Sequence, residues 1–288
     1  MTEQMGYASR MTVGGNAVEF ITHDIKETRE LVEDDGIRGV RSRVLERVAL
    51  GNIKVGGSIT FEPTPAEMAI LLPLVVSSST SATVLTDAMA DVTVVIDTVT
   101  KLYTYIGRFT AMHLTGEPGK KIKLKLDFVG KTLVVASGGS LAGIPDITVR
   151  PYMMADMGSG ITIGGTVYSV DKFEMTLDNH IEPTFMQGQT ATDLEPTDRT
   201  VSLGIQTRYN TAEDALLVLA QTGPVIASPL TASVAFTNGV KSMTFTFGAL
   251  VAKSETVTHP GKKGKLRLPL NYNCYKVGTT LETVPVLV

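Results

Sequence analysis

A stretch of 13 residues occurs twice in the sequence, and this repeat constrains the fold more than any other feature. Residues 116–128 read GEPGKKIKLKLDF and residues 258–270 read THPGKKGKLRLPL; seven of the eleven positions from the shared Pro-Gly onward are identical. After that turn, apolar and charged residues alternate, and a period of two over about eight residues is typical of a half-buried β-strand. Each copy is therefore predicted to be a strand with one buried face, and the alignment pairs Phe128 with Leu270.

The repeat extends along the chain. Two further segments match in the same order: MTVGGN at 11–16 with ITIGGT at 161–166, and TPAEMAIL at 64–71 with NTAEDALL at 210–217. These matches lie at offsets of 150 and 146 residues, and the repeated strand lies at 142. A constant order with small drifts indicates a duplicated domain of about 145 residues, a usual domain size. We therefore expect two homologous domains, residues 1–140 and 141–288.

The composition favours β structure, because Val and Thr are frequent in short runs and Gly is plentiful. One helix is predicted in each half. In the first half, Thr64 and Glu67 form a capping-box pattern with Pro65 at the first helical position, and Pro73 should end or kink the helix early. In the second half, Asn210 takes the capping position. The expected fold is mainly β: two tandem homologous β-sandwich or barrel domains, each with one short α-helix.

The two halves are expected to differ in one projecting arm. Residues 38–62 of the first half alternate in strand fashion and carry many charges, and Gly51-Asn52 suggests a turn, so the segment is predicted to be a long β-hairpin. The matching segment of the second half, 181–198, contains prolines and glycines that weaken any strand. It is expected to be a loop.

The sequence contains no pattern that we can assign to catalysis, a metal or a cofactor. The four histidines are far apart in sequence, and Cys274, the one cysteine, fits a small buried hydrophobe. Gly130-Lys131-Thr132 lacks the earlier glycine of a phosphate-binding loop. The duplicated lysines that begin at Lys120 could bind phosphate, although a solvated strand face is the favoured interpretation. We expect that the protein is not an enzyme.

Charge and hydropathy limit the partners. The net charge is −3, whereas proteins that grip nucleic acid usually carry a basic excess. The longest apolar run, residues 68–76, contains a proline and is about half as long as a membrane span. We therefore expect neither specific DNA binding nor membrane insertion.

Three segments carry a resemblance to a known family. They are GIRGVRSRVLERVALGNIKVGGSITFEPTPAEMAILL at 36–72, FEMTLDNHIEPTF at 173–185 and VSLGIQTRYNTAEDALL at 201–217. Together they resemble the major tail tube proteins of tailed bacteriophages. The resemblance implies β-sandwich domains whose inner sheets join between subunits into a barrel around a DNA channel. A duplicated chain would form pseudo-sixfold rings from three copies, and the rings would stack into a tube.

The same resemblance implies partners, a location and an interface. The partners would be further copies of the chain and the tape measure, tail tip and terminator proteins, with double-stranded DNA passing through unbound. The protein would be assembled in the host cytoplasm and would end in the virion tail. Packing of the charged arm against neighbours would involve the side chains of Arg38, Arg41, Arg43, Glu46 and Arg47. A channel that must not hold DNA suggests a polar and acidic lining.

A second function stays open. A tandem β-sandwich binding module, such as a virion decoration protein or an adhesin for carbohydrate or a receptor, could share this fold. Such binders usually present exposed aromatic side chains, and this chain has 6% aromatic residues and no tryptophan. The composition therefore favours the tube protein.

Overall fold

The computed structural model describes residues 9–33, 45, 48–76, 85–137, 141, 149–221, 228–239, 241–255, 257, 265–277 and 282–287. The fold is mainly β, as predicted, with antiparallel pairing between the strands of its sheets. No helix in this part of the chain is long and apolar enough to cross a membrane.

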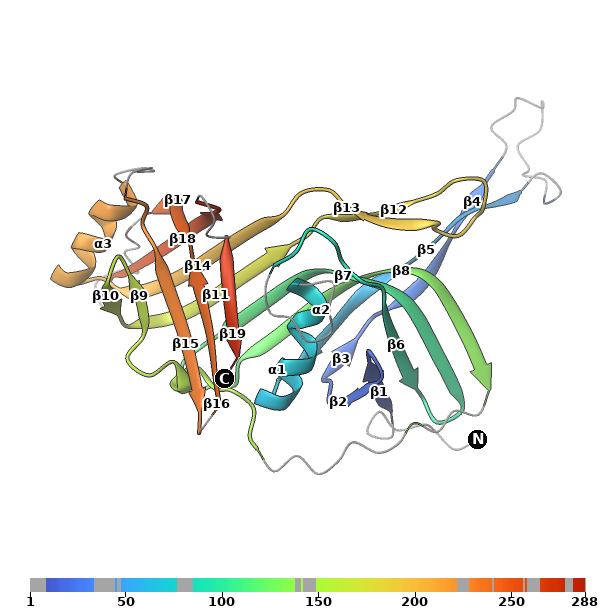
Figure 1. Ribbon diagram of the computed structural model, residues 1–288, viewed down its shortest axis with the longest axis horizontal. Helices are drawn as coiled ribbons and strands as arrows, with labels where there is room; N and C mark the ends of the chain where they lie inside the picture. The colour runs from blue at the N-terminus through green and yellow to red at the C-terminus, as the bar shows by residue number, and fades with distance from the viewer. Residues whose placement is uncertain are drawn as a thin grey trace.

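The largest sheet has twelve strands and extends through both halves of the chain (Figure 1). Its main path is β17 (Ala249–Glu255), β18 (Arg267–Tyr275), β14 (Thr200–Arg208), β11 (Val170–Asp178), β7 (Lys101–Gly116), β8 (Lys123–Ser137) and β5 (Ala49–Phe61). The far edge of β5 pairs with β3 (Thr22–His23) and β4 (Lys26–Val32). A branch from β7 consists of β6 (Val92–Asp97), β1 (Arg10–Val13) and β2 (Asn16–Val18).

A second layer covers the apolar face of this sheet. Over the second half it is a five-stranded sheet: β10 (Thr166–Tyr168), β9 (Ile161–Ile163), β15 (Ala232–Asn238), β16 (Lys241–Phe247) and β19 (Thr283–Leu287). Over the first half it consists of the β6 branch with α1 (Pro65–Leu71) and α2 (Pro73–Val76) (Figure 1). The rings of Phe173 and Phe236 meet edge to face between the layers, 5.6 Å apart. The remaining elements are the 3₁₀ helix η3 (Met154–Met157), α3 (Thr211–Gln221) and the hairpin of β12 (Ile181–Thr184) and β13 (Asp193–Pro196).

The repeated strand behaves as the alternation predicts. In β8, Leu124, Leu126 and Phe128 are buried, whereas Lys123 and Lys125 are exposed. The predicted helix is also confirmed: Thr64 Oγ1 accepts a hydrogen bond from the backbone of Glu67, and Glu67 Oε2 accepts one from the backbone of Thr64 at 2.9 Å. As expected, α1 ends before Pro73, where α2 begins.

The expected turn at Gly51-Asn52 is wrong, because β5 runs through these residues. The two residues together lie opposite Glu30, between the pairs Arg29↔Ile53 and Leu31↔Leu50, where the β4–β5 register shifts by one residue. A side chain at Gly51 would meet Val32 Cγ2 at 3.0 Å, so this glycine permits close packing in a bulged hairpin. The first arm is therefore the hairpin of β4 and β5.

The expected loop at 181–198 is also wrong, because this segment forms the β12–β13 hairpin. Pro183 and Pro196 are compatible with it because a two-stranded ribbon has an open edge at which no amide donor is needed. Each half thus has an arm: β4–β5 in the first and β12–β13 in the second.

The structure aligns the two repeated strands at a different offset from the one that the sequence repeat gives. In the first half a bulge lies between Phe109 and Ala111, opposite Phe128 and its neighbour. In the second half the same bulge lies between Ala252 and Ser254, opposite Tyr272 and its neighbour. Phe128 therefore corresponds to Tyr272 (offset 144) rather than to Leu270 (offset 142).

Candidate assembly surfaces

Strand β7 joins the sheets of the two halves. One edge of β7 pairs with β8 along almost its whole length, whereas the other edge is shared by two strands. Residues 102–107 pair with β6, and residues 111–116 pair with β11, from Ala111↔Asp178 to Gly116↔Phe173. The second half of the chain therefore continues the sheet of the first without a break. We call this β7–β11 pairing the internal joint.

Asn179 secures the joint where β11 ends. Its backbone N–H donates to the Thr110 carbonyl at 2.8 Å, and its side-chain amide donates to the Val75 carbonyl at 3.0 Å. Its Oδ1 accepts a hydrogen bond from Arg199 Nε at 3.1 Å. Because Asn179 is buried, these bonds satisfy polar groups that water cannot reach.

The large sheet ends in open edges. Within the described part of the chain, β17 pairs only with β18, and β3 and β4 pair only with β5. Unpaired strand edges expose backbone donors and acceptors and can pair with another chain. The two edges lie on opposite sides of the sheet path, as a repeating assembly requires.

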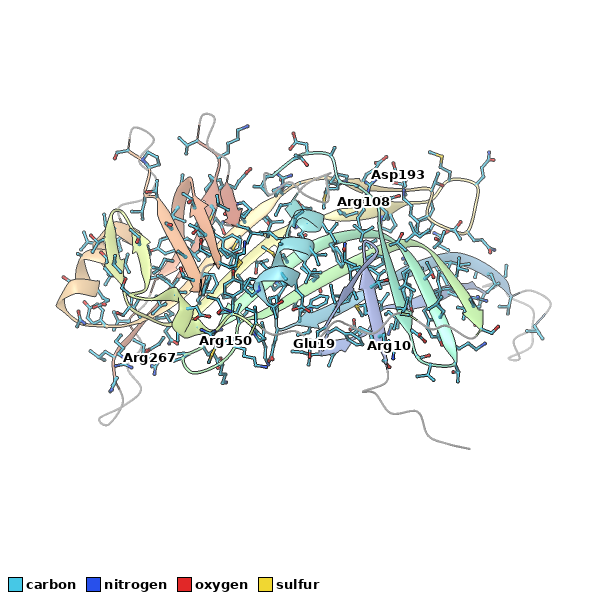
Figure 2. The ribbon with its side chains drawn as sticks, turned by 60° about the horizontal axis from the view of Figure 1, so that its bottom comes forward. Arg10, Glu19, Arg108, Arg150, Asp193 and Arg267 are labelled. Atoms are coloured by element: carbon cyan, nitrogen blue, oxygen red, sulfur yellow. The ribbon has the colours of Figure 1, made fainter. Side chains whose placement is uncertain are left out.

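The second arm crosses the exposed face of the large sheet in the first half (Figure 2). Arg108 donates from Nε to Asp91 at 2.8 Å and also to the Leu194 carbonyl, and its guanidinium lies 3.6 Å from Asp193. Lys131 Nζ lies 2.8 Å from Asp91 and 3.2 Å from Asp193. The hydrogen bond to Asp91 raises the pKa of Lys131. The pKa of Asp193 is lowered, first by the backbone N–H of Leu194 and then by Lys131.

An apolar cluster lies beneath these charges. Met89 of the first half packs with three buried residues of the second arm, Ile181, Ala191 and Leu194. Val129 of β8 also contacts this cluster. Near the tip of the arm, the Gln189 carbonyl accepts a hydrogen bond from the Ile53 N–H at 2.7 Å. The arm is therefore held by apolar contact, by charge and by backbone hydrogen bonds.

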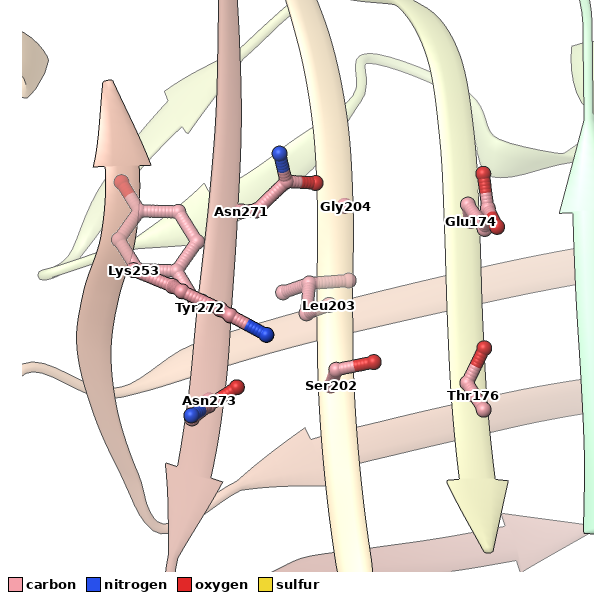
Figure 3. Close-up of a pocket in the computed structure, with 9 residues that line it drawn as sticks. All are labelled: Glu174, Thr176, Ser202, Leu203, Gly204, Lys253, Asn271, Tyr272 and Asn273. Atoms are coloured by element: carbon pink, nitrogen blue, oxygen red, sulfur yellow. The ribbon is translucent and has the colours of Figure 1, made fainter.

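The exposed face of the large sheet is polar. Figure 3 shows a shallow hollow of about 400 Å³ on this face, with Glu174, Ser202, Lys253 and Asn271 around it. Gly204 leaves room at its floor, because a side chain there would meet Asn271 Oδ1 at 3.0 Å.

Charges on this face lie beside charges of opposite sign. Lys172 is 3.1 Å from Glu174, and Lys125 is 2.9 Å from Asp127. His113 bridges Asp127, at 3.0 Å, and Thr176 across the internal joint. Burial acts to raise the pKa of Asp127, but the hydrogen bonds from His113 and Lys125 outweigh it and keep the pKa below its usual value.

The described residues do not assemble catalytic chemistry. No group of three His, Cys, Asp or Glu side chains among them could hold a metal ion. Cys274 is buried, and desolvation raises its pKa to about 12, so its thiol stays protonated at neutral pH.

The interface residues predicted from the sequence differ from the residues that hold the second arm. Arg38, Arg41, Arg43, Glu46 and Arg47 lie outside the described residues. The sequence-based prediction missed Arg108, Lys131 and Asp193. A signal for Arg108 was present, because this is the one Lys, Arg, Asp or Glu in residues 102–116, and a lone charge in a largely apolar strand needs a partner.

Comparisons with known proteins give the family. A family model described as phage tail tube protein matches residues 3–274, nearly the whole chain. Among curated proteins no match is found. The matched span includes the internal joint and both arms. The chain therefore belongs to the phage tail tube protein family and is a structural protein of the virion tail.

Proposed function

We propose that three copies of this chain form a pseudo-sixfold ring, and that stacked rings make the tube that conducts DNA into the host. The observation that carries this proposal is the internal joint, because it already connects two similar halves edge to edge in one sheet. A ring follows when the same connection is repeated between chains.

The strand equivalences support this repetition. β17 has the same bulge as β7. It is therefore taken as the equivalent of β7, the strand that pairs with β11 in the internal joint. On the other side, the pair His23↔Ile59 in β3–β5 corresponds to Phe173↔Ile205 in β11–β14. In the proposed ring, β17 of one copy therefore pairs with β3 and β4 of the next.

The same equivalences support two tandem tube domains, residues 1–140 and 141–288, related by duplication. Each has a strand hairpin as an arm, a helix and a two-layered core. Three chains then supply six similar domains. A closed ring with three identical contacts and three internal joints is the symmetric solution for such a chain.

We assign to the channel the part of the exposed face of the large sheet that the arms leave uncovered, around the internal joint. This face has lysines as well as acids, so the proposal replaces the acidic lining expected from net charge with one of paired opposite charges such as Lys125–Asp127. Such pairs present little net charge to a duplex. DNA would pass without the counterion release that drives tight binding.

The partners in the proposal are other copies of the chain along the tube and the tape measure, tail tip and terminator proteins within it and at its ends. Assembly would take place in the host cytoplasm. In the proposal, Arg38, Arg41, Arg43, Glu46 and Arg47, which lie outside the described residues, would contact neighbouring subunits.

Negative-stain electron microscopy of the purified protein, dilute and then concentrated, tests the proposal. We expect hollow rings or tubes whose end views have threefold or pseudo-sixfold symmetry. Separate monomers at every concentration, even with tail-tip complexes as seeds, would contradict it and favour a tandem binding module.

A further inference from the structure

The two arms have the same construction at their bases. In the first half the strand partners keep one register from Thr22↔Thr60 to Arg29↔Ile53, and the register slips by one residue at Leu31↔Leu50. In the second half the β11–β14 register slips by one residue before Ile181↔Pro196. At the offsets of 150 and 146, Leu31 corresponds to Ile181, and Leu50 corresponds to Pro196.

The environments of Leu31 and Ile181 are opposite, whereas Leu50 and Pro196 are both exposed. Ile181 is 6% exposed, because the second arm lies on the exposed face of the large sheet in the first half. Leu31 is 57% exposed and Leu50 is 46% exposed, and their neighbour Val32 is exposed as well. Leu31 and Leu50 are directly paired across the β4–β5 hairpin and form an apolar patch, which we call the first-arm patch.

The internal joint explains the difference. It places the second half beside the first, so that the second arm has β7 and β8 beneath it. The first arm lies at the other end of the molecule, far from β17 and β18 (Figure 1). Only another copy of the chain, joined in the same way, would bring a β17–β18 surface beneath the first arm.

That surface has the chemistry to receive the patch. The second arm lies against Arg108 and Lys131 of the first half, and Val129 of β8 contacts its cluster. The pair Arg108↔Val129 corresponds to Val251↔Asn273, and Lys131 corresponds to Tyr275. Tyr275 is 49% exposed, and Val251 is partly exposed. Where the internal contact has two cations that bind Asp193, the equivalent surface has an aliphatic and an aromatic side chain.

We propose that the first-arm patch docks onto the β17–β18 surface around Val251, Asn273 and Tyr275 of a second copy of the chain. The inference rests on the ring proposed above and adds which residues hold adjacent copies together. It also assigns the chemistry, because apolar burial rather than ion pairing holds this contact. The charged residues within 38–47 are not needed for it.

A cysteine pair tests the contact directly. Leu31→Cys and Asn273→Cys place thiols where Leu31 and Asn273 would meet, since Val129, the equivalent of Asn273, contacts the cluster that contains Ile181. Within one chain the two sites lie at opposite ends, so a short bismaleimide can link them only between copies. Cys274 is buried and should not react. The control is Val167→Cys with Asn273→Cys, because Val167 is comparably exposed on β10.

We expect covalent dimers and trimers from the Leu31→Cys pair under assembly conditions and none from the control pair. Leu31→Ser should also raise the critical concentration for polymerisation by about tenfold or more, since a buried Leu is lost from each contact. Val167→Ser should leave it unchanged. The thermal unfolding of dilute, unassembled protein should be the same in both Ser variants, because Leu31 and Val167 are exposed there.

Microscopy of the same samples separates the two proposals. Tubes without specific cross-links, together with a normal critical concentration for Leu31→Ser, would overturn the docking and leave the tube function intact. Specific cross-links without tubes would support the docking and contradict the ring. If the wild-type protein gives no tubes and the Leu31→Cys, Asn273→Cys variant gives no cross-links, both proposals fail.

Discussion

The side-chain amide of Asn179, from the second half of the chain, donates a hydrogen bond to the backbone carbonyl of Val75, from the first half, at 3.0 Å. Val75 lies in the short helix α2, which contributes to the first core, and Asn179 follows the strand that makes the internal joint. The bond therefore connects the core of one half to the edge of the other. This hydrogen bond therefore helps to fix the position of one half relative to the other.

We predict that Asn179→Ala destabilises the chain by about 1–3 kcal/mol, because it leaves the buried Val75 carbonyl and the Arg199 guanidinium without this partner. Urea unfolding followed by circular dichroism measures the change. Asn16→Ala is the control, since the Asn16 amide bonds to Gly14 at an exposed turn. Equal stability of the two variants would show that Asn179 does not secure the joint.

Arg108 and Asp193 both hold the second arm on the first half, and we predict that replacing them destabilises the protein to different extents. Arg108 has a side chain 15% exposed and bonds to Asp91 and to Leu194, so Arg108→Met should cost about 1–3 kcal/mol because the Leu194 carbonyl loses this donor and Asp91 keeps only Lys131. The Asp193 side chain is 50% exposed, and Asp193→Asn should cost under about 1 kcal/mol because water and salt screen its pairs.

Hydrogen exchange of the second arm tests this order. Faster exchange at residues 189–194 should accompany Arg108→Met and be weak in Asp193→Asn. The opposite order would mean that Asp193, rather than Arg108, holds the arm.

Local patterns in the sequence predicted local structure well. The alternation of Leu124 and Lys125 gave the buried and exposed faces of β8, and Thr64 with Glu67 gave the start of α1, because each depends on residues a few positions apart. The β class followed from the same kind of signal.

Long-range pairing could not be predicted in the same way. The joint Gly116↔Phe173 depends on which of several compatible edges meet, and neither residue type specifies a partner. The sequence at Gly51 predicts a turn. Its role in the fold is close packing against Val32, a residue on another strand, and a local pattern does not show such a contact. The arm contact of Arg108 with Asp193 spans the two halves, so only the folded chain brings it together.

The segment between the halves should be sensitive to acid through Asp156. Its side chain is 6% exposed and accepts hydrogen bonds from Arg150 at 2.6 and 2.7 Å and from the Met153 N–H at 2.8 Å. The Arg150 hydrogen bonds lower the pKa of Asp156, and burial opposes them without reversing the shift. A lowered carboxyl pKa stabilises the fold above the unfolded-state value, near 3.9, and this stabilisation is lost as the pH falls through the lower folded-state value.

We therefore predict that Asp156→Asn is less stable than the wild type at pH 7 and that the difference shrinks as the pH falls below about 4. Urea unfolding of both proteins between pH 7 and pH 2 measures it. Asp198→Asn serves as the control, because Asp198 is exposed. A difference that stays constant over this range would mean that the charge of Asp156 contributes nothing.

Two glycines of the large sheet should differ sharply when replaced by alanine. A Cβ at Gly107 would lie 2.5 Å from the Gly130 Cα and would also overlap the Val129 carbonyl, both backbone atoms of the paired strand at the β7–β8 register shift. Relief would require the strands to separate where β7 passes from β6 to β11. Gly107→Ala should therefore cost more than about 2 kcal/mol or prevent folding.

At Gly204 the nearest atom to an added Cβ is Asn271 Oδ1 at 3.0 Å, the end of a side chain that can turn towards the hollow on the exposed face. Gly204→Ala should cost under about 1 kcal/mol, partly offset by the lower entropy of the unfolded chain. Thermal unfolding of the two variants beside the wild type measures both changes. Comparable losses would mean that the backbone at Gly107 can move as readily as the Asn271 side chain, and that close strand contact does not fix the β7–β8 register shift.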